Sequence, residues 1–285
     1  MGATALNVTN GDAAVSDVAR AAGVPPESVL PWRDVLHDGP VPAGLGAEAL
    51  ARVRAAHIAA RGWAGEAEAL VAFLERDARL AAHPLDAEVV LWFEDDLYDA
   101  LQLAQLGDRL AGRPGPVTRV VMPHDRGGGF GAAFAARERV APDGAAFAAL
   151  RSPDPRAWAD HPSMARLLEE LPETGSGLSR LEREILEALA AGPLDGAELF
   201  ARVAEREQPP WLGDASVWAA AAELGPLVAR DSDEAWRLTA AGEAVLAGRA
   251  RREPHDHWIG GVHLVPSEPG WAWDPRAGQA VRAEP

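Results

Sequence analysis

The chain has 285 residues, and its 27 basic side chains are outnumbered by 43 acidic ones, which gives a net charge of −16. This length predicts about two domains. There is no cysteine, and every basic residue is arginine because no lysine occurs. These absences exclude disulfides and cysteine metal sites, a lysine Schiff base and hence the usual pyridoxal-phosphate chemistry, and a P-loop lysine.

The acidic balance also argues against two classes of partner. Non-specific nucleic-acid binding needs basic charge against the phosphates, and an anionic membrane surface attracts basic segments. No apolar run of about 18 residues occurs, and the first residues, MGATALNVTNGDAAV, lack the basic start and apolar core of a signal peptide. We therefore expect a cytoplasmic protein that binds neither nucleic acid nor membrane.

The first half predicts alternating strands and helices. Strands are expected at Ala5–Thr9, from Val29-Leu30 into Pro31, at Glu88–Phe93 and at Val117–Met122. Helices are expected at 12–22, over an Ala-rich region at 46–82 that is broken near Gly62–Gly65, and at 97–110. Such alternation is typical of a parallel sheet. We expect a Rossmann-like, mostly parallel α/β domain over residues 1–150.

The second half has a different pattern. A helical linker is expected at 151–176, a winged-helix-like α+β domain at 177–250, and a C-terminal β-hairpin and tail at 251–285. The winged-helix-like part comprises helices at 180–191, 195–207 and 214–224, a hairpin of 227–230 with 235–238, and a last helix from Thr239. Ser179 and Glu182 have capping-box spacing at the first of these helices. In the tail, Trp258–Val265 and Trp271–Trp273 are expected to pair and to close over the domain junction.

A charge test argues against DNA binding by this second domain. A DNA reader would carry Arg or Lys on its recognition helix and wing. Here the candidate helix reads DASVWAAAAELG, and the wing turn is Asp-Ser-Asp at 231–233. We interpret the domain as a packing module or a homodimer interface.

A short polar segment follows each of the four predicted strands, and every one of these segments includes ionisable residues. They are Asn10, Gly11 and Asp12; Arg33, Asp34, His37 and Asp38; Glu94, Asp95 and Asp96; and His124, Asp125 and Arg126. Because ligands of open parallel sheets bind outside the carboxyl ends of the strands, these residues are the candidate site. The candidate acid/base or metal-binding groups are His37, Asp34, Asp38, Asp96 and His124.

Substrate binding is assigned to a second set of residues. This set comprises Asn10, Gly11, Asp12, Arg33, Arg126 and His263. An arginine can clamp a phosphate or carboxylate, but Arg33 could equally pair with a neighbouring aspartate. Asp12 and Asp96 could each be helix caps, and the glycines at 127–129 could cradle a phosphate or form a flexible loop. Trp32 and Trp92 fit core packing better than a stacking wall.

Cofactor expectations are limited. The first strand is followed by TNGD without a G-x-G-x-x-G motif, so no dinucleotide is expected. A divalent metal remains open, and His255 and His257, two residues apart on a predicted strand, form a geometrically allowed but isolated metal pair.

Four segments carry a resemblance to a known family. They are TNGD at 9–12, LPWRDVLHDGPVP at 30–42, VLWFEDDLYDALQLAQL at 90–106 and LLEELPETGSGLSRLEREILEAL at 167–189, and HWIGGVHL and WAWD in the tail fit as well. In these segments the chain resembles the bacterial family known as domain of unknown function 1835. The resemblance implies one unit of strand-end motifs and C-terminal strands, and no reaction. It implies a departure at Asp95, where relatives are expected to carry His, so a metal-ligand or proton-transfer role there is in doubt.

The sequence thus favours an enzyme acting on a small polar metabolite, such as a nucleotide or a phosphorylated or amino-acid-like compound. Hydrolysis or group transfer is favoured because no redox motif is present. The alternatives are a non-enzymatic ligand sensor that signals through the winged helix, and a scaffold whose acidic surface meets a basic protein.

Overall fold

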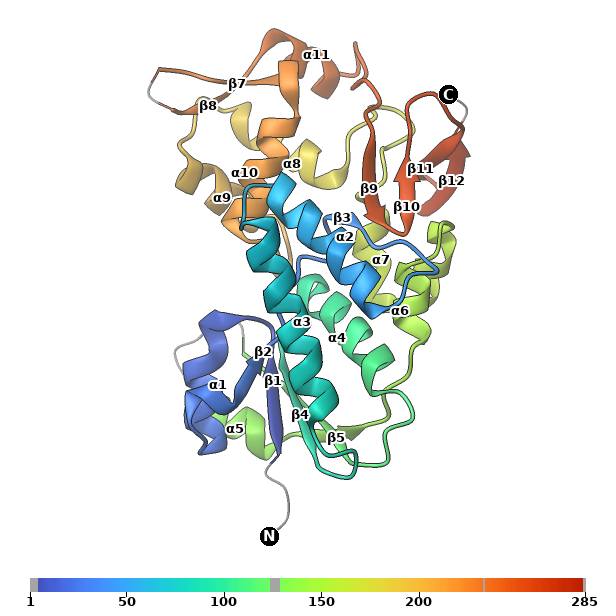
Figure 1. Ribbon diagram of the computed structural model, residues 1–285. Helices are drawn as coiled ribbons and strands as arrows, with labels where there is room; N and C mark the ends of the chain where they lie inside the picture. Colours follow the sequence, from blue (N-terminus) through green and yellow to red (C-terminus); the bar gives the residue numbers. More distant parts are fainter. Residues whose placement is uncertain (1–4, 124–128, 233, 284–285) are drawn as a thin grey trace. The chain divides into compact units, whose positions relative to one another are not determined.

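The structure is a computed structural model that describes residues 5–123, 129–232 and 234–283. The chain divides into two compact units, and the division falls between Ser152 and Pro153. The first unit is coloured blue to green in Figure 1, and the second unit is coloured yellow-green to red. Within the described ranges, no helix has both the length and the apolar character that crossing a membrane requires.

The first unit is a mixed α/β structure built on a five-stranded, mostly parallel sheet. Its strands are β1 (Leu6–Thr9), β2 (Val29–Pro31), β4 (Val89–Phe93), β5 (Val117–Val121) and β6 (Glu138–Val140), in the order β2-β1-β4-β5-β6. The first four are parallel and lie where the sequence predicts them. Strand β6 is antiparallel to β5 and was not predicted. It has three residues, two of them exposed, so it carries no apolar pattern.

The helices of this unit match the predicted ones closely over residues 12–110. They are η1 (Asp12–Ala14), α1 (Val15–Ala22), η2 (Pro26–Ser28), α2 (Ala47–Ala60), α3 (Glu66–Ala82), α4 (Leu97–Leu110), α5 (Phe130–Ala135) and α6 (Ala145–Leu150), and β3 is the short strand Gly39–Pro40. The predicted helix at 12–22 begins as a 3-10 turn. Helix α5 was not predicted, and α6 lies in a region, 140–176, where helical turns were expected; both helices have only six residues.

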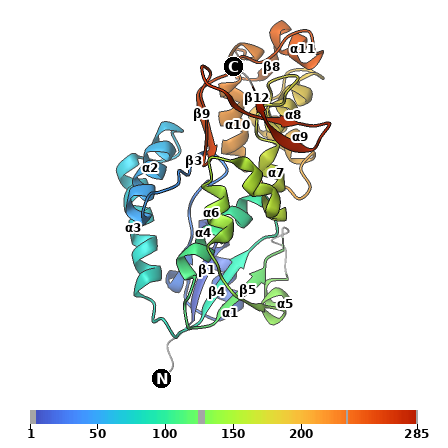
Figure 2. The ribbon, with the colours of Figure 1, turned by 90° about the vertical axis from the view of Figure 1, so that its right-hand side faces the viewer.

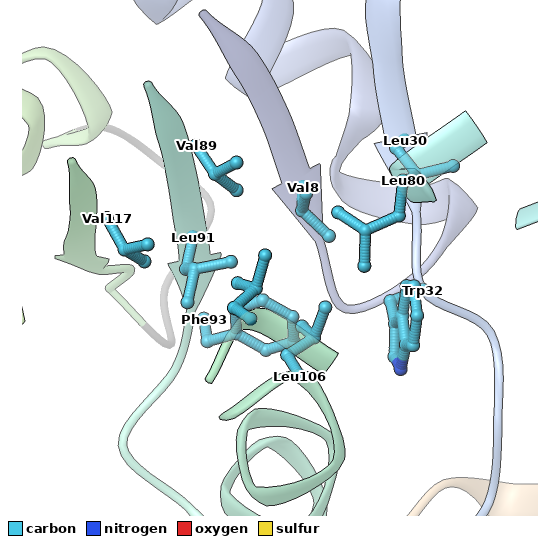
Figure 3. Close-up of a cluster of buried hydrophobic side chains, with 10 residues drawn as sticks. Val8, Leu30, Trp32, Leu80, Val89, Leu91, Phe93, Leu106 and Val117 are labelled. Atoms are coloured by element: carbon cyan, nitrogen blue, oxygen red, sulfur yellow. The ribbon is translucent and has the colours of Figure 1, made fainter. Parts of the chain in front are cut away.

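The sheet buries both faces, because alternate residues of a strand point to opposite sides. On one face Val8, Leu91 and Phe93 pack with side chains of α3 and α4 (Figure 3). On the other face Val90 and Trp92 pack with residues of α1 and α5. Figure 2 shows these helices on opposite sides of the sheet. Burial on both faces explains the continuous apolar run of β4.

Trp32 and Trp92 are core residues, as expected, and neither is exposed. The indole of Trp32 donates to Gln105 Oε1 at 2.8 Å, and that of Trp92 donates to Asn7 Oδ1 at 2.9 Å. Each buried N–H thus has the acceptor that it needs inside a core.

The second unit combines short helices with antiparallel strand pairs. Its elements are η3 (Pro155–Asp160), η4 (Pro162–Met164), α7 (Ala165–Leu168), α8 (Arg180–Leu189), α9 (Gly196–Ala204), α10 (Asp214–Glu223), η5 (Gly225–Leu227), β7 (Val228–Arg230), β8 (Trp236–Leu238), α11 (Ala240–Leu246), β9 (His257–Gly260), β10 (Val262–Leu264), β11 (Gly270–Asp274) and β12 (Gln279–Ala283). The predicted capping box of α8 is present: Ser179 Oγ accepts from the Glu182 amide at 3.2 Å, and the Ser179 amide donates to Glu182 Oε2 at 3.0 Å.

The C-terminal strands pair differently from the expectation. Strand β9 pairs with β10, and β11 pairs with β12, both antiparallel. The chain therefore turns within Trp258–Val265, where Gly260 adopts φ +55°. A left-handed residue of this kind suits glycine, and it closes a hairpin inside the segment that was expected to be one strand.

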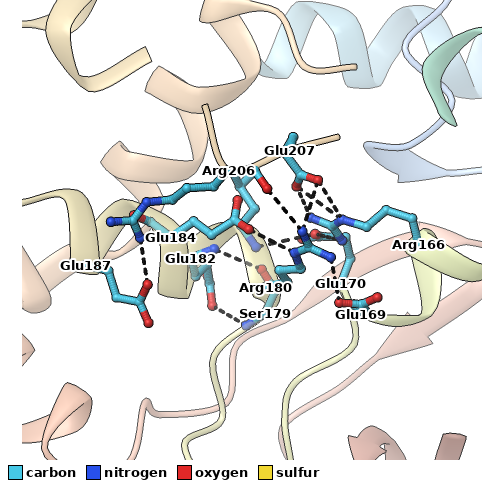
Figure 4. Close-up of polar contacts among 11 residues, drawn as sticks. Arg166, Glu169, Glu170, Ser179, Arg180, Glu182, Glu184, Glu187, Arg206 and Glu207 are labelled. Atoms are coloured by element: carbon cyan, nitrogen blue, oxygen red, sulfur yellow. Dashed lines mark hydrogen bonds and ion pairs between the residues drawn. The ribbon is translucent and has the colours of Figure 1, made fainter. Parts of the chain in front are cut away.

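A network of ion pairs lies where α7, α8 and the segment after α9 meet (Figure 4). Arg166 lies at its centre and pairs with Glu207, which is 2% exposed, and with Glu170 Oε1 at 2.6 Å. Arg180 extends the network to Glu184 Oε1 at 2.8 Å. Buried charges are tolerated only when paired, so this network fixes how residues 165–170 pack on α8.

Candidate functional site

The strand order places a topological switch point between β1 and β4. From β1 the chain reaches β2 on one side through α1, and it later returns to β4 on the other side of β1. Helices α1 and α3 accordingly cover opposite faces of the sheet. Ligands of open α/β sheets bind in the crevice at the carboxyl ends of the strands that flank such a point. The residues after β1, β2 and β4 are therefore the candidate site.

Helix α4 carries a stripe of polar residues that joins these strand ends. Asp99, Gln102 and Gln105 follow one another at intervals of three residues, and each is at most 1% exposed. Asp99 accepts from Asn10 after β1, and Gln102 Nε2 donates to the Asp34 carbonyl after β2 at 2.9 Å. The stripe thus fixes the ends of β1 and β2 against α4.

Asp99 is the innermost carboxyl group of the site. Both of its oxygens accept from Asn10 Nδ2, at 2.9 and 3.0 Å, and Oδ2 also accepts from the Glu94 amide. Burial raises the pKa of Asp99 to about 8, and the nearby Asp96 carboxylate acts in the same direction. Because Asp99 is completely shielded from solvent, we assign it to positioning β1 against β4.

Asp34, expected as a catalytic group, lies in a buried ion pair instead. Its Oδ1 accepts from Arg54 Nε at 3.0 Å, from Arg54 Nη2 at 2.9 Å and from the Val35 amide at 2.8 Å. Both charged side chains are 1% exposed. Arg54, on α2, also donates to the carbonyls of Val35, Asp38 and Pro40. This pair holds the loop after β2, and its burial favours a structural role for Asp34.

Asp38 also has partners from α2 and its C-terminal end. Its Oδ1 lies 2.6 Å from Arg61 Nη2 and 3.2 Å from His57 Nε2. Burial by itself would raise the pKa of Asp38, but the His57 imidazole and the Arg61 cation outweigh it and hold this pKa well below its usual range. Gly39 has φ +82°, and a Cβ there would lie 2.4 Å from the His57 ring. Asp38 thus contributes to the same loop anchor.

His37 lies on the loop that these pairs anchor. It is half-buried, and its ring meets the edge of the Tyr98 ring at a centroid distance of 5.9 Å. Burial lowers the pKa of His37 to about 4. The positive charges of Arg54 and Arg61 also disfavour the imidazolium and act in the same direction. The imidazole is therefore neutral at pH 7, the state in which it can accept a proton.

Arg33 and Asp12 form an exposed bidentate pair after β2 and β1. Arg33 Nε donates to Asp12 Oδ2 at 2.6 Å, and Nη2 donates to Oδ1 at 2.5 Å. The pairing lowers the pKa of Asp12 and raises that of Arg33. Asp12 does not cap a helix through its side chain, and the N-terminal residue before η1 is Gly11, which is half-buried. Exposed pairs of this kind contribute little stability, so Arg33 can exchange Asp12 for a ligand anion.

The acidic residues after β4 have different environments: one caps helix α4 and another faces solvent. Asp96 is the N-cap of α4, and its Oδ1 accepts from the Asp99 amide at 2.9 Å. Asp95 is exposed and lies 3.3 Å from Arg119 Nη2. The helix-cap alternative for Asp96 is thus seen in the structure, and the cap does not preclude a further role because the residue is only half-buried.

Two predicted site residues are not among the described ones, and a third, His263, belongs to the second unit. His124 and Arg126, with Gly127 and Gly128, lie outside the described residues. His263 is on β10 of the second unit, where its Nε2 is 2.8 Å from Asp256 Oδ1 and its ring stacks on Trp258 at 4.3 Å. This local pairing gives His263 a role within its own hairpin.

The metal expectation gains no support from geometry. Within the ranges that the structure describes, no group of three or more His, Asp or Glu side chains is arranged to hold an ion. His255 and His257 stack their rings at a centroid distance of 4.1 Å, and Arg252 contacts His255 Nδ1. A cation beside a ring nitrogen disfavours a second cation there.

Sequence reasoning missed the residues that organise this edge. These are Arg54, His57 and Arg61 on and after α2, and Gln102 and Gln105 on α4. The sequence did contain a pattern that could have indicated them. Arg54, His57 and Arg61 are three and four positions apart, the spacing of one helix face, and the helix is otherwise rich in alanine. Polar residues at such spacing on an apolar helix indicate buried partners.

No protein-family model matches the chain, and no curated protein matches it. The resemblance to domain of unknown function 1835 therefore stays a prediction, and the function rests on the geometry of the site.

Proposed function

We propose that the first unit binds a small polar metabolite at the carboxyl edge of its sheet and acts on it by hydrolysis or group transfer. The substrate would be a nucleotide or a phosphorylated or amino-acid-like compound. The observation that carries this proposal is the buried stripe of α4, which cross-links the strand ends at the switch point. Beside that stripe, the loop after β2 carries both the half-buried His37 and the exposed Arg33.

Each group has a role that its environment supports. The neutral imidazole of His37 would take a proton from an attacking water or acceptor hydroxyl. A pKa of about 4 makes it a weak base in the free protein, but an anionic substrate beside the ring would raise this pKa because it favours the imidazolium. Arg33 would bind the anionic group of the substrate, and the Asn10-Gly11-Asp12 turn would line the site beside it.

Asp96 stays a candidate second acid/base group at this edge. Asp34 and Asp38 become positioning residues in the proposal, because their contacts with Arg54, His57 and Arg61 hold the loop of His37.

The test begins with ligand discovery. Thermal unfolding of the full chain would be measured against a panel of nucleotides, sugar phosphates and phosphorylated amino acids, and compounds that raise Tm would be followed by NMR for turnover. We expect H37Q to slow turnover by about 100-fold or more with binding retained. We expect R33Q to weaken binding by about tenfold.

Matched controls are available in the same unit. His83→Gln changes a histidine whose Nε2 lies 3.0 Å from the Glu88 carbonyl, at the opposite end of β4. Arg20→Gln changes an exposed arginine that pairs with Asp17 on α1. If H37Q and R33Q behave as these controls do, or if no compound of the panel raises Tm, the site is not at this edge.

A second candidate is a non-enzymatic ligand-sensing or protein-interaction module. The succession α8, α9, α10, β7–β8 and α11 is what favours it, because three helices, a strand pair and a helix are the parts of a winged helix. Helix α10 contains no basic residue, which disfavours DNA as the partner. In this case H37Q would lower ligand affinity, and no product would form with the wild type.

A further inference from the structure

The second unit contains a cavity of about 320 Å³. Its lining includes Pro172, Gly177, Arg252, Leu264, Trp271 and Ala283, all of which belong to the second unit. None of the candidate residues at the sheet edge lines it. The volume lies at the lower end of the range for small-molecule sites, which is about 300–1,000 Å³.

The wall around residue 252 is held in place without a ligand. The Arg252 amide donates to the Ser176 carbonyl at 2.9 Å, and Arg251 Nη1 donates to the Thr174 carbonyl at 3.0 Å. Gly177 has φ +72°, and a Cβ there would lie 2.8 Å from the Arg252 carbonyl oxygen. Only glycine permits this close approach. A wall of this kind is preorganised, which lowers the entropic cost of binding.

An apolar wall is formed around Trp271. This side chain is 5% exposed, and its indole N–H donates to the Pro153 carbonyl at 3.0 Å. The Arg282 guanidinium lies over the indole at 4.2 Å from the ring centroid, which further fixes the ring. Leu264 and Pro172 also line the cavity. These residues suit a flat or compact apolar body.

The polar lining of the cavity includes two arginines, one buried and one exposed, and two histidines, His255 and His257. Arg252 is 7% exposed and pairs with Glu182 Oε1 at 2.7 Å. Its Nε–H is buried and finds no acceptor among the described residues. Arg251 is exposed, and no described carboxylate pairs with it.

The cavity also has two acidic side chains on its lining, Glu253 and Glu268, and both are exposed. Because they would repel an anion, an anionic group would have to enter on the side of the arginines. The exposed Arg251 would meet this anionic group first, and Arg252, which is 7% exposed, lies next to it in the wall.

We infer that this cavity binds a small anion with an apolar body, a carboxylate or a phosphate monoester, in a site distinct from the sheet edge. The anionic group contacts Arg251 and Arg252, and the apolar body packs on Trp271 and Leu264. This site does not depend on the proposed reaction of the first unit.

The test uses benzoate and phenyl phosphate as probes, with benzamide as the neutral match of benzoate. Binding to the full chain would be measured by saturation-transfer NMR, which reports contact and needs no activity. We expect at least one anion to bind, and benzamide to bind about tenfold more weakly than benzoate. Equal binding of benzamide and benzoate, or no binding of either anion at millimolar concentration, would overturn the proposal.

Variants locate the binding in this cavity. Ala283→Leu adds volume at a half-buried position of the lining, and Arg251→Gln removes the exposed charge. We expect the first to abolish binding and the second to weaken it by about tenfold. Arg276→Gln is the control, since Arg276 is exposed in the same unit and outside the lining.

A folding control accompanies the binding measurements on the variants. Circular dichroism checks Ala283→Leu, and R251Q at an exposed residue keeps the test valid if that variant does not fold. Anion binding that both folded variants leave unchanged would show that the cavity is not the site.

Discussion

The buried pair of Arg54 and Asp34 provides the sharpest prediction about the loop that carries His37. In Arg54→Met the buried Asp34 carboxylate loses both hydrogen bonds from Arg54 and keeps the one from the Val35 amide. Three carbonyls, those of Val35, Asp38 and Pro40, also lose a donor. Removing one partner of a buried ion pair costs about 3–5 kcal/mol. We expect the free energy of unfolding of the first unit to fall by about this amount.

Hydrogen exchange followed by mass spectrometry would measure this effect on peptides that cover residues 34–40. A loss of this size makes exchange from the native state at least about 100-fold faster there, and peptides of the second unit provide the internal reference. Arg52→Met is the matched control, because Arg52 lies on the same helix but pairs with Glu48 in solvent. It should cost no more than about 0.5 kcal/mol. If both variants lose the same stability, the buried pair does not hold the loop.

Two further predictions concern titration and backbone geometry in the first unit. The pKa of Asp99 is about 8 in the folded chain against 3.8 ordinarily, so the folded state retains a proton that the unfolded state loses, and stability falls as pH rises from about 4 to about 8. Urea unfolding across this range should show a weaker dependence of the unfolding free energy on pH in Asp99→Asn, and the wild-type dependence in Asp95→Asn. If Asp99→Asn leaves the pH dependence unchanged, the pKa of Asp99 is not raised by folding. Gly39→Ala and Gly44→Ala both place alanine at a left-handed φ, but only at Gly39 does the new Cβ meet a neighbour, the His57 ring. Gly39→Ala should therefore be the less stable by about 1–3 kcal/mol, and equal unfolding free energies would show that the ring moves aside freely.

Local patterns predicted most elements of the first unit. The four parallel strands and helices α2, α3 and α4 were readable because apolar periodicity and helix-breaking glycines are properties of neighbouring residues. Very short elements were missed, among them the three-residue β6 and the six-residue α5, because so few residues show no periodicity. In the tail, the change of direction at Gly260 depended on one residue's backbone conformation, and the pairing of β9 with β10 followed from it.

The sequence by itself determined that polar residues gather at one edge of a parallel sheet, because the carboxyl ends of parallel strands meet there. It could not determine which of them face solvent and which face each other. Asp34 and His37 are three positions apart on one loop, yet Arg54 neutralises the first in the interior while the second stays half-buried beside Tyr98. These fates depend on partners 20 or more positions away. Burial and pairing are long-range properties, and only the tertiary structure decides them, because the cost of an interior charge depends on what lies across from it.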